Sequence, residues 1–170
     1  MNRDDLIIYF DMDGVLANFE GYVKEQGIPY IPLGIKHRPS DAEMWARIKE
    51  IPHFYAKLPA IERTVQLFKE LSENYQCEIL SAIPKPKWGL KNTGEDKIEW
   101  CHKYLDKNAI VHIVYREQKK EFAIGKHCIL IDDLAKNIKE WNDLGGSGIL
   151  YSDDISIDVI KNEIRKLIGG

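Results

Sequence analysis

The chain has 170 residues, of which 44% are hydrophobic and 30% charged, and its net charge is −3 at pH 7. These values suit one globular domain spanning residues 1–170, without the basic face that duplex nucleic acid requires or an apolar run long enough to span a membrane. The three cysteines are widely spaced and form no CxxC pattern, which argues against a zinc site or a disulfide framework.

The segment ahead of the first apolar run bears on localisation. Arg3, Asp4 and Asp5 lead directly into that run, so we expect no signal peptide. Two of the cysteines lie in or beside apolar strand segments, where a free thiol behaves as a small hydrophobe. Both observations predict a protein of the reducing cytoplasm.

The first predicted element is a buried strand over Leu6–Phe10, followed at once by Asp11, Asp13 and Gly14. Two carboxylates this close repel each other and lose hydration unless a cation lies between them. Mg²⁺, a hard divalent cation that prefers oxygen ligands, is the natural candidate. A solvated Asp-x-Asp-Gly turn is the alternative for an isolated match.

A long interval follows, over residues 16–58, and it exceeds what a single crossover needs. We expect two short helices there, at roughly 16–26 and 40–50, because apolar and aromatic residues recur through both segments. They are predicted to form a small helical cap, inserted after the first strand, over the carboxyl edge of the sheet. The alternative is a helical subdomain with a purely structural role.

The remainder of the chain alternates between strands and helices. Further strand-like runs occur at Cys77–Leu80, Ile110–Val114, Cys128–Ile131 and Gly148–Tyr151. Amphipathic helical patterns separate them and end the chain, around residues 61–71, 98–105, 134–144 and 157–168. This alternation predicts an α/β fold, a doubly wound, Rossmann-like parallel sheet of about five strands.

A second acidic pair, Asp132 and Asp133, follows the predicted strand Cys128–Ile131 and repeats the pattern of Asp11 and Asp13. In a parallel sheet, ligands bind outside the carboxyl ends of the strands. These four aspartates are expected at such ends, so the repetition favours a metal site over two unrelated turns.

The residues from Asp11 to Leu16 resemble the first motif of the haloacid dehalogenase (HAD) superfamily of phosphatases, and residues 129–133 resemble its fourth motif. Within that superfamily, other segments are similar to the 5'(3')-deoxyribonucleotidases of the cytosolic type C 5'-nucleotidase family. These segments are residues 11–22, residues 97–100, and Trp45 ahead of Phe54, Leu58 and Pro59. The similarity extends loosely from residue 5 to about residue 150.

The resemblance implies a mechanism for the four aspartates. Asp11 would be the nucleophile and form an aspartyl-phosphate, and Asp13 would act as general acid and base. Mg²⁺ would be held by Asp11, by the backbone carbonyl of Asp13 and by a carboxylate from the pair Asp132 and Asp133. Which member of that pair binds the ion directly is left open.

Candidate phosphate-binding groups lie outside the acidic motifs. Ser81 directly follows the predicted strand Cys77–Leu80, but Ala82 comes next where the family usually has a second hydroxyl residue. Lys119 or Lys120 would be the lysine of the third motif, and Lys119 is slightly favoured by its spacing ahead of Phe122. Lys97 is a second phosphate candidate. The alternative for each lysine is a solvated surface position.

The lead hypothesis is therefore a Mg²⁺-dependent phosphatase for a nucleoside monophosphate, in which Phe19 and Trp45 stack on the base. The alternatives are a structural role for both aromatic residues and a substrate that is another small phosphometabolite or a 3'-phosphate end. A receiver-type signalling domain is disfavoured, because Tyr115 and Arg116 follow the third strand where a receiver has its phosphorylated aspartate. The base, the sugar, the phosphate position and the choice between monomer and homodimer stay open.

Overall fold

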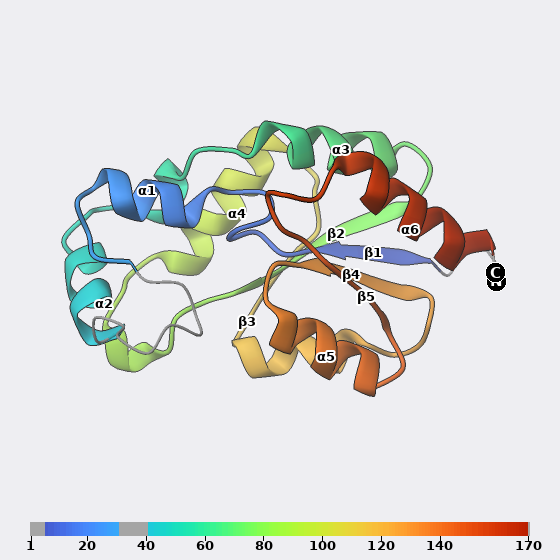
Figure 1. Ribbon diagram of the computed structural model, residues 1–170. Coiled ribbons are helices and arrows are strands. Elements are labelled where there is room, and N and C mark those ends of the chain that lie inside the picture. Colours follow the sequence, from blue (N-terminus) through green and yellow to red (C-terminus); the bar gives the residue numbers. More distant parts are fainter. Residues whose placement is uncertain (1–5, 31–40, 170) are drawn as a thin grey trace.

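The computed structural model describes residues 6–30 and 41–169, and within them five strands form one all-parallel sheet (Figure 1). Their order across the sheet is β3-β2-β1-β4-β5. The strands are β1 (Ile7–Phe10), β2 (Gln76–Ala82), β3 (Val111–Val114), β4 (Cys128–Asp132) and β5 (Ser147–Leu150). The predicted fold class is confirmed.

Helices cover both faces of this sheet (Figure 1). One face carries α3 (Glu62–Ser72), α4 (Thr93–Tyr104) and α6 (Ile157–Gly169). The other carries α5 (Ala135–Asp143) and the 3₁₀ helix η4 (Arg116–Phe122). Because both faces of the sheet are covered, all five residues of β4 are buried in succession. Strands of this kind have near-continuous apolar runs in the sequence.

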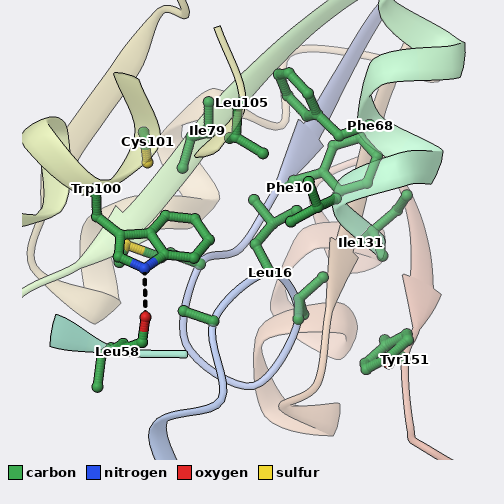
Figure 2. Packing of buried hydrophobic residues seen from close by; sticks show 14 of the residues in the cluster. Phe10, Leu16, Leu58, Phe68, Ile79, Trp100, Cys101, Leu105, Ile131 and Tyr151 are labelled. Carbon is green, nitrogen blue, oxygen red and sulfur yellow. Dashed lines mark hydrogen bonds between the residues drawn. The ribbon is translucent and has the colours of Figure 1, made fainter. Parts of the chain in front are cut away.

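Alternate residues of β1 enter two separate cores. Phe10 packs edge-on against Phe68 of α3, with ring centroids 5.2 Å apart, in the larger core (Figure 2). Trp100 of α4 is fully buried in that core, and its indole Nε1 donates to the carbonyl oxygen of Leu58 at 2.7 Å (Figure 2). Tyr9 points to the opposite face of the sheet and packs edge-on against Trp141 of α5, with ring centroids 5.6 Å apart, in the smaller core.

The short helices α1 (Phe19–Glu25) and α2 (Asp41–Lys49) lie beyond the carboxyl ends of the strands, together with the 3₁₀ helices η2 (Tyr55–Lys57) and η3 (Pro86–Trp88) (Figure 1). Both α-helices fall within the two predicted helical ranges. Asn18 caps α1, since its Oδ1 accepts from the backbone N–H of Gly21 at 2.9 Å. Residues 31–40 of the predicted insertion lie outside the described residues.

The register of the sheet brings its acidic ends together. Phe10 pairs with Ile79 of β2 and Ile131 of β4, so Asp11 follows β1 directly beside Asp132 at the end of β4. The backbone N–H of Asp11 donates to the carbonyl oxygen of Ile131 at 2.9 Å. Among the described residues, every helix is too short or too polar to cross a membrane.

Candidate functional site

Three carboxylates meet at the carboxyl edge of the sheet. Asp11, Asp132 and Asp133 each present an oxygen, and these oxygens all lie within 4.8 Å of one another. Gly14 makes room for this group: its φ is +81°, and a Cβ built on it would lie 2.2 Å from Oδ2 of Asp133. Only glycine adopts this conformation readily while allowing so close an approach.

Lys119 is the cation of this cluster. Its Nζ lies 2.8 Å from Oδ1 of Asp11 and 2.8 Å from Oδ2 of Asp132, and its side chain is almost completely buried. Lys120 is exposed. Consecutive residues of a 3₁₀ helix with three residues per turn point in different directions, so η4 can direct only one of the two lysines inward. The structure places Lys119 there.

The two adjacent aspartates of β4 have different environments. Asp132 is fully buried, and both of its oxygens accept hydrogen bonds: Oδ1 from the backbone N–H of Leu134 at 2.8 Å, and Oδ2 from Lys119 and from Nδ2 of Asn137 at 2.9 Å. Asp133 is exposed and lines the pocket described below. Asp132 is therefore engaged by the protein, whereas Asp133 faces the cavity.

The electrostatics of the cluster call for another positive charge. The pKa of Asp11 is raised to about 7: burial is the largest cause, Lys119 opposes the rise, and the charges of Asp132 and Asp13 add to it. The pKa of Asp133 is also raised, by desolvation in the crowded pocket and by the charges of Asp11 and Asp132. Burial lowers the pKa of Lys119, but the two carboxylates beside it outweigh this effect and raise it. Acidic groups this close and this hard to ionise fit a divalent cation with oxygen ligands.

A second group of polar side chains surrounds Lys97 of α4. Its Nζ donates to Oδ2 of Asp13 at 2.7 Å, to Oγ of Ser81 at 2.9 Å and to the carbonyl oxygen of Ala82 at 2.8 Å. It also lies 4.5 Å from the centre of the Tyr55 ring. Lys97 is fully buried, so it is not a surface lysine, and these acceptors use all three N–H groups of its ammonium.

Asp13 combines one engaged and one unpartnered oxygen. Oδ2 accepts from Lys97, whereas Oδ1 is buried and has no hydrogen-bond partner among the described residues. A buried polar atom in this state usually has a ligand, a proton or a functional role. Ser81 is fully buried as well, and its neighbour Ala82 rather than Ser81 lines the pocket.

Side chains from both polar groups line a cavity of about 430 Å³. Its polar wall includes Asp11, Asp13, Asp133, Lys119 and Arg116, and its aromatic wall is formed by Phe19, Tyr30 and Trp45. This volume suits a small organic ligand, and apolar walls with a few convergent polar groups are typical of such sites.

Phe19 and Trp45, predicted from the sequence, lie next to each other on this wall. Their ring centroids are 6.3 Å apart, and both side chains are partly buried. Phe19 also stacks on Tyr55 at 6.0 Å and packs edge-on against Phe54 at 5.7 Å. Phe19 therefore contributes to the packing of the helical segment and to the cavity at once.

Sequence reasoning missed Arg116 and Asn137. Arg116 lines the cavity, and its Nη1 donates to Oδ1 of Asn137 at 3.1 Å and to Glu140 at 3.0 Å. A signal for Arg116 was present, because it stands three residues ahead of Lys119 and so lies on the same face of a 3₁₀ helix. Nothing in the sequence alone singles out Asn137.

Comparisons with known proteins agree with this geometry. No family model matches the chain. A curated protein of Vibrio phage KVP40, named "Putative 5'(3')-deoxyribonucleotidase", is 29% identical over 134 residues, which are 79% of this chain and 69% of the phage protein. In sequence, the chain resembles this protein.

Solved structures of HAD hydrolases are similar in fold. A haloacid dehalogenase-like hydrolase from Xanthomonas campestris superposes with a TM-score of 0.63 at 12% identity, over 99% of this chain and 100% of that one. A HAD family enzyme from Bacteroides thetaiotaomicron, solved as a magnesium complex, gives a TM-score of 0.54 at 16% identity, over 92% and 98% of the two chains. The chain has the fold of the HAD superfamily, as its motifs predicted.

Proposed function

We propose that this protein is a Mg²⁺-dependent phosphatase that hydrolyses a nucleoside monophosphate through an aspartyl-phosphate on Asp11. One observation carries the proposal: Asp11, Asp13, Asp133 and Lys119 line a single cavity that is also lined by the aromatic side chains of Phe19, Tyr30 and Trp45. The phage protein named as a deoxyribonucleotidase and the magnesium complex of a HAD enzyme support it.

The choice between Asp132 and Asp133 as a cation ligand follows from which oxygens the protein leaves available. Asp11, Asp133 and the backbone carbonyl of Asp13 would hold Mg²⁺, while Asp132, whose oxygens are both engaged, would hold Lys119 and Asn137 in place. When bound, the ion would neutralise charge on the phosphoryl oxygens.

Asp11 has the environment of an oriented nucleophile. Its Oδ1 accepts from the backbone N–H of Met12 at 2.8 Å and from Lys119, and these two contacts fix the plane of the carboxylate. Oδ2 would attack the phosphorus, so a bond forms between them while the bond from phosphorus to the leaving ester oxygen breaks. Lys119 favours the ionised carboxylate that this attack requires.

Asp13 is placed to move a proton. Lys97 donates to Oδ2 of Asp13, and the carboxyl group of Asp13, which lines the cavity, would carry the proton to the leaving oxygen and later accept one from the water that hydrolyses the aspartyl-phosphate. The sequence suggested Lys97 as a phosphate-binding residue. We propose instead that Lys97 orients Asp13 and Ser81. Ser81, whose Oγ accepts from Lys97, would help to hold this ammonium beside Asp13.

The aromatic wall provides the argument for a nucleotide. Phe19, Tyr30 and Trp45 border the cavity that contains the reacting carboxylates, and aromatic faces stack on nucleobases. Three aromatic side chains beside the reacting carboxylates therefore favour a nucleotide over a small aliphatic phosphate.

A phosphate-release screen tests the proposal. Metal-free protein, with and without added Mg²⁺, would be assayed on 5'- and 3'-monophosphates of ribo- and deoxyribonucleosides, on sugar phosphates and on p-nitrophenyl phosphate. We expect Mg²⁺-dependent release and the highest kcat/KM for a nucleoside monophosphate. A sugar phosphate as the best substrate would contradict the nucleotide assignment, and no release from any ester would contradict the phosphatase assignment.

A further inference from the structure

The loop that follows β5 forms part of the cavity wall. Tyr151, Ser152 and Asp153 line the cavity together with the reacting carboxylates. The backbone N–H of Tyr151 donates to the carbonyl oxygen of Asp132 at 2.9 Å, so the loop begins beside the acidic cluster. Its next residues are exposed, and the side chain of Asp153 is 87% accessible. The loop can therefore contact a substrate.

One side chain from another element holds this loop. Arg63 of α3 donates through Nε and Nη2 to the hydroxyl of Tyr151 at 3.0 and 2.7 Å, through Nη2 to the carbonyl oxygen of Ser152 at 3.1 Å, and through Nη1 to that of Ile155 at 3.0 Å. Its guanidinium also packs over the Tyr151 ring, 5.1 Å from the centroid. A single planar group thus joins three points of the loop.

Both ends of the loop are anchored, because Tyr151 lies in the larger core and Ile155 packs against it, but the residues between them have few contacts of their own. Ser152, Asp153 and Asp154 are exposed, and segments with few buried apolar contacts open at low free-energy cost. Bonds from a charged donor are stronger than those between neutral groups, and the rigid fork of arginine matches several acceptors at once. The position of this wall therefore depends on Arg63.

Asp153 gives the loop a chemical preference. Its Oδ1 accepts from the hydroxyl of Tyr151 at 3.2 Å and lies 3.5 Å from Nη2 of Arg63. A carboxylate only accepts hydrogen bonds, so Asp153 would recognise a hydroxyl or amino group of a substrate and would repel a further phosphate.

We propose that Arg63 is a positioning residue that holds the loop of residues 151–155 against the substrate, so that Asp153 selects the polar, non-phosphate part of a monophosphate ester. The inference rests on the proposed function, because it names the part of the same cavity that recognises the leaving group. Neither residue takes part in the chemical step, so both act on KM and leave kcat unchanged.

Kinetics of Arg63→Met and Asp153→Asn test the inference, with Asp154→Asn as a matched control on an exposed neighbour that does not line the cavity. We expect each of the first two variants to raise KM for the best nucleoside monophosphate about tenfold, the effect of losing one or two hydrogen bonds, with kcat within about twofold of the wild type. p-Nitrophenyl phosphate lacks a donor for Asp153, so its KM should not change. The control should match the wild type on both substrates.

The outcomes separate the two proposals. A wild-type protein that hydrolyses no nucleoside monophosphate would contradict the proposed function itself. Nucleotide hydrolysis that is indifferent to Asp153→Asn, or a loss shared equally by both substrates, would overturn the role of the loop alone. If melting curves show that Arg63→Met does not fold, Asp153→Asn still decides, because its exposed side chain can be changed without disturbing the fold.

Discussion

Lys119→Met should destabilise the protein strongly at neutral and alkaline pH. The ammonium lies 2.8 Å from an oxygen of Asp11 and 2.8 Å from one of Asp132, and the side chains of these two residues are 10% and 0% exposed. Methionine has a similar length and fills the same space, so the packing changes little. The substitution removes the counter-charge of two buried acids and leaves them facing each other.

The expected size of the effect follows from breaking a buried ion pair from one side, which costs about 3–5 kcal/mol. For a chain of this length, each kcal/mol lowers the melting temperature by roughly 2–4 °C, so we expect a fall of about 10 °C. Typical domains are stable by only about 5–15 kcal/mol, so this is a large share of the total. Urea unfolding without divalent cations measures it.

The pH dependence distinguishes this cause from a packing defect. The pKa of Asp11 is raised from 3.8 to about 7 in the folded protein, and loss of Lys119, which lowers it, would raise it further. The folded state then binds the proton more tightly than the unfolded state, so the free energy of unfolding falls as pH rises toward the folded pKa. In the wild type this fall ends near pH 7, whereas in the variant it continues above pH 7.

The difference in unfolding free energy between wild type and Lys119→Met should therefore be larger at pH 8.5 than at pH 5.5. Lys120→Met is the matched control, because Lys120 is exposed on the same 3₁₀ helix, and its effect should stay within about 0.5 kcal/mol. An equal loss for Lys119→Met at both pH values, or a comparable loss for Lys120→Met, would refute the reasoning.

Three further predictions concern activity. Asp11→Asn should fold normally yet lower phosphate release by at least about 10³-fold, because an amide cannot serve as the nucleophile; near-normal turnover would show that another group attacks. Activity should vanish in EDTA, return with Mg²⁺ and be inhibited by Ca²⁺, which takes more oxygen ligands and could bind both oxygens of Asp11; undiminished release in EDTA would exclude the metal model. Trp45→Ala should lower kcat/KM for nucleotides by an amount equivalent to about 1–3 kcal/mol of transition-state stabilisation, and it should leave kcat/KM for p-nitrophenyl phosphate unchanged. If Trp45 is purely structural, kcat/KM for both substrates and the melting temperature would fall together.

The fold could be predicted from the sequence because strands and helices leave patterns that extend over only a few neighbouring residues. Apolar runs such as Cys128–Ile131 mark strands buried on both faces, and amphipathic stretches between them mark the covering helices. The acidic residues of the candidate site were readable for the same reason, since Asp11 and Asp132 directly adjoin such strands. In a parallel sheet, this position alone brings them to the same edge.

Only the tertiary structure decided which side chains meet. In the sequence, spacing favours Lys119 over Lys120 only slightly, and it is the direction in which η4 places each side chain that separates them. Asp132 and Asp133 differ in burial and in whether the protein already engages their oxygens, and neither difference is visible in the sequence.

Lys97 and Asp13 lie 84 positions apart, and the contact between them depends on where α4 packs. The same is true of Arg63 and Tyr151, which are 88 positions apart. The sequence by itself determined the strands and the residues at their ends, because burial and periodicity act over a few neighbouring positions. Contacts between distant side chains depend on how whole helices and strands pack. They also depend on which polar atoms already have hydrogen-bond partners, and a local sequence pattern contains neither kind of information.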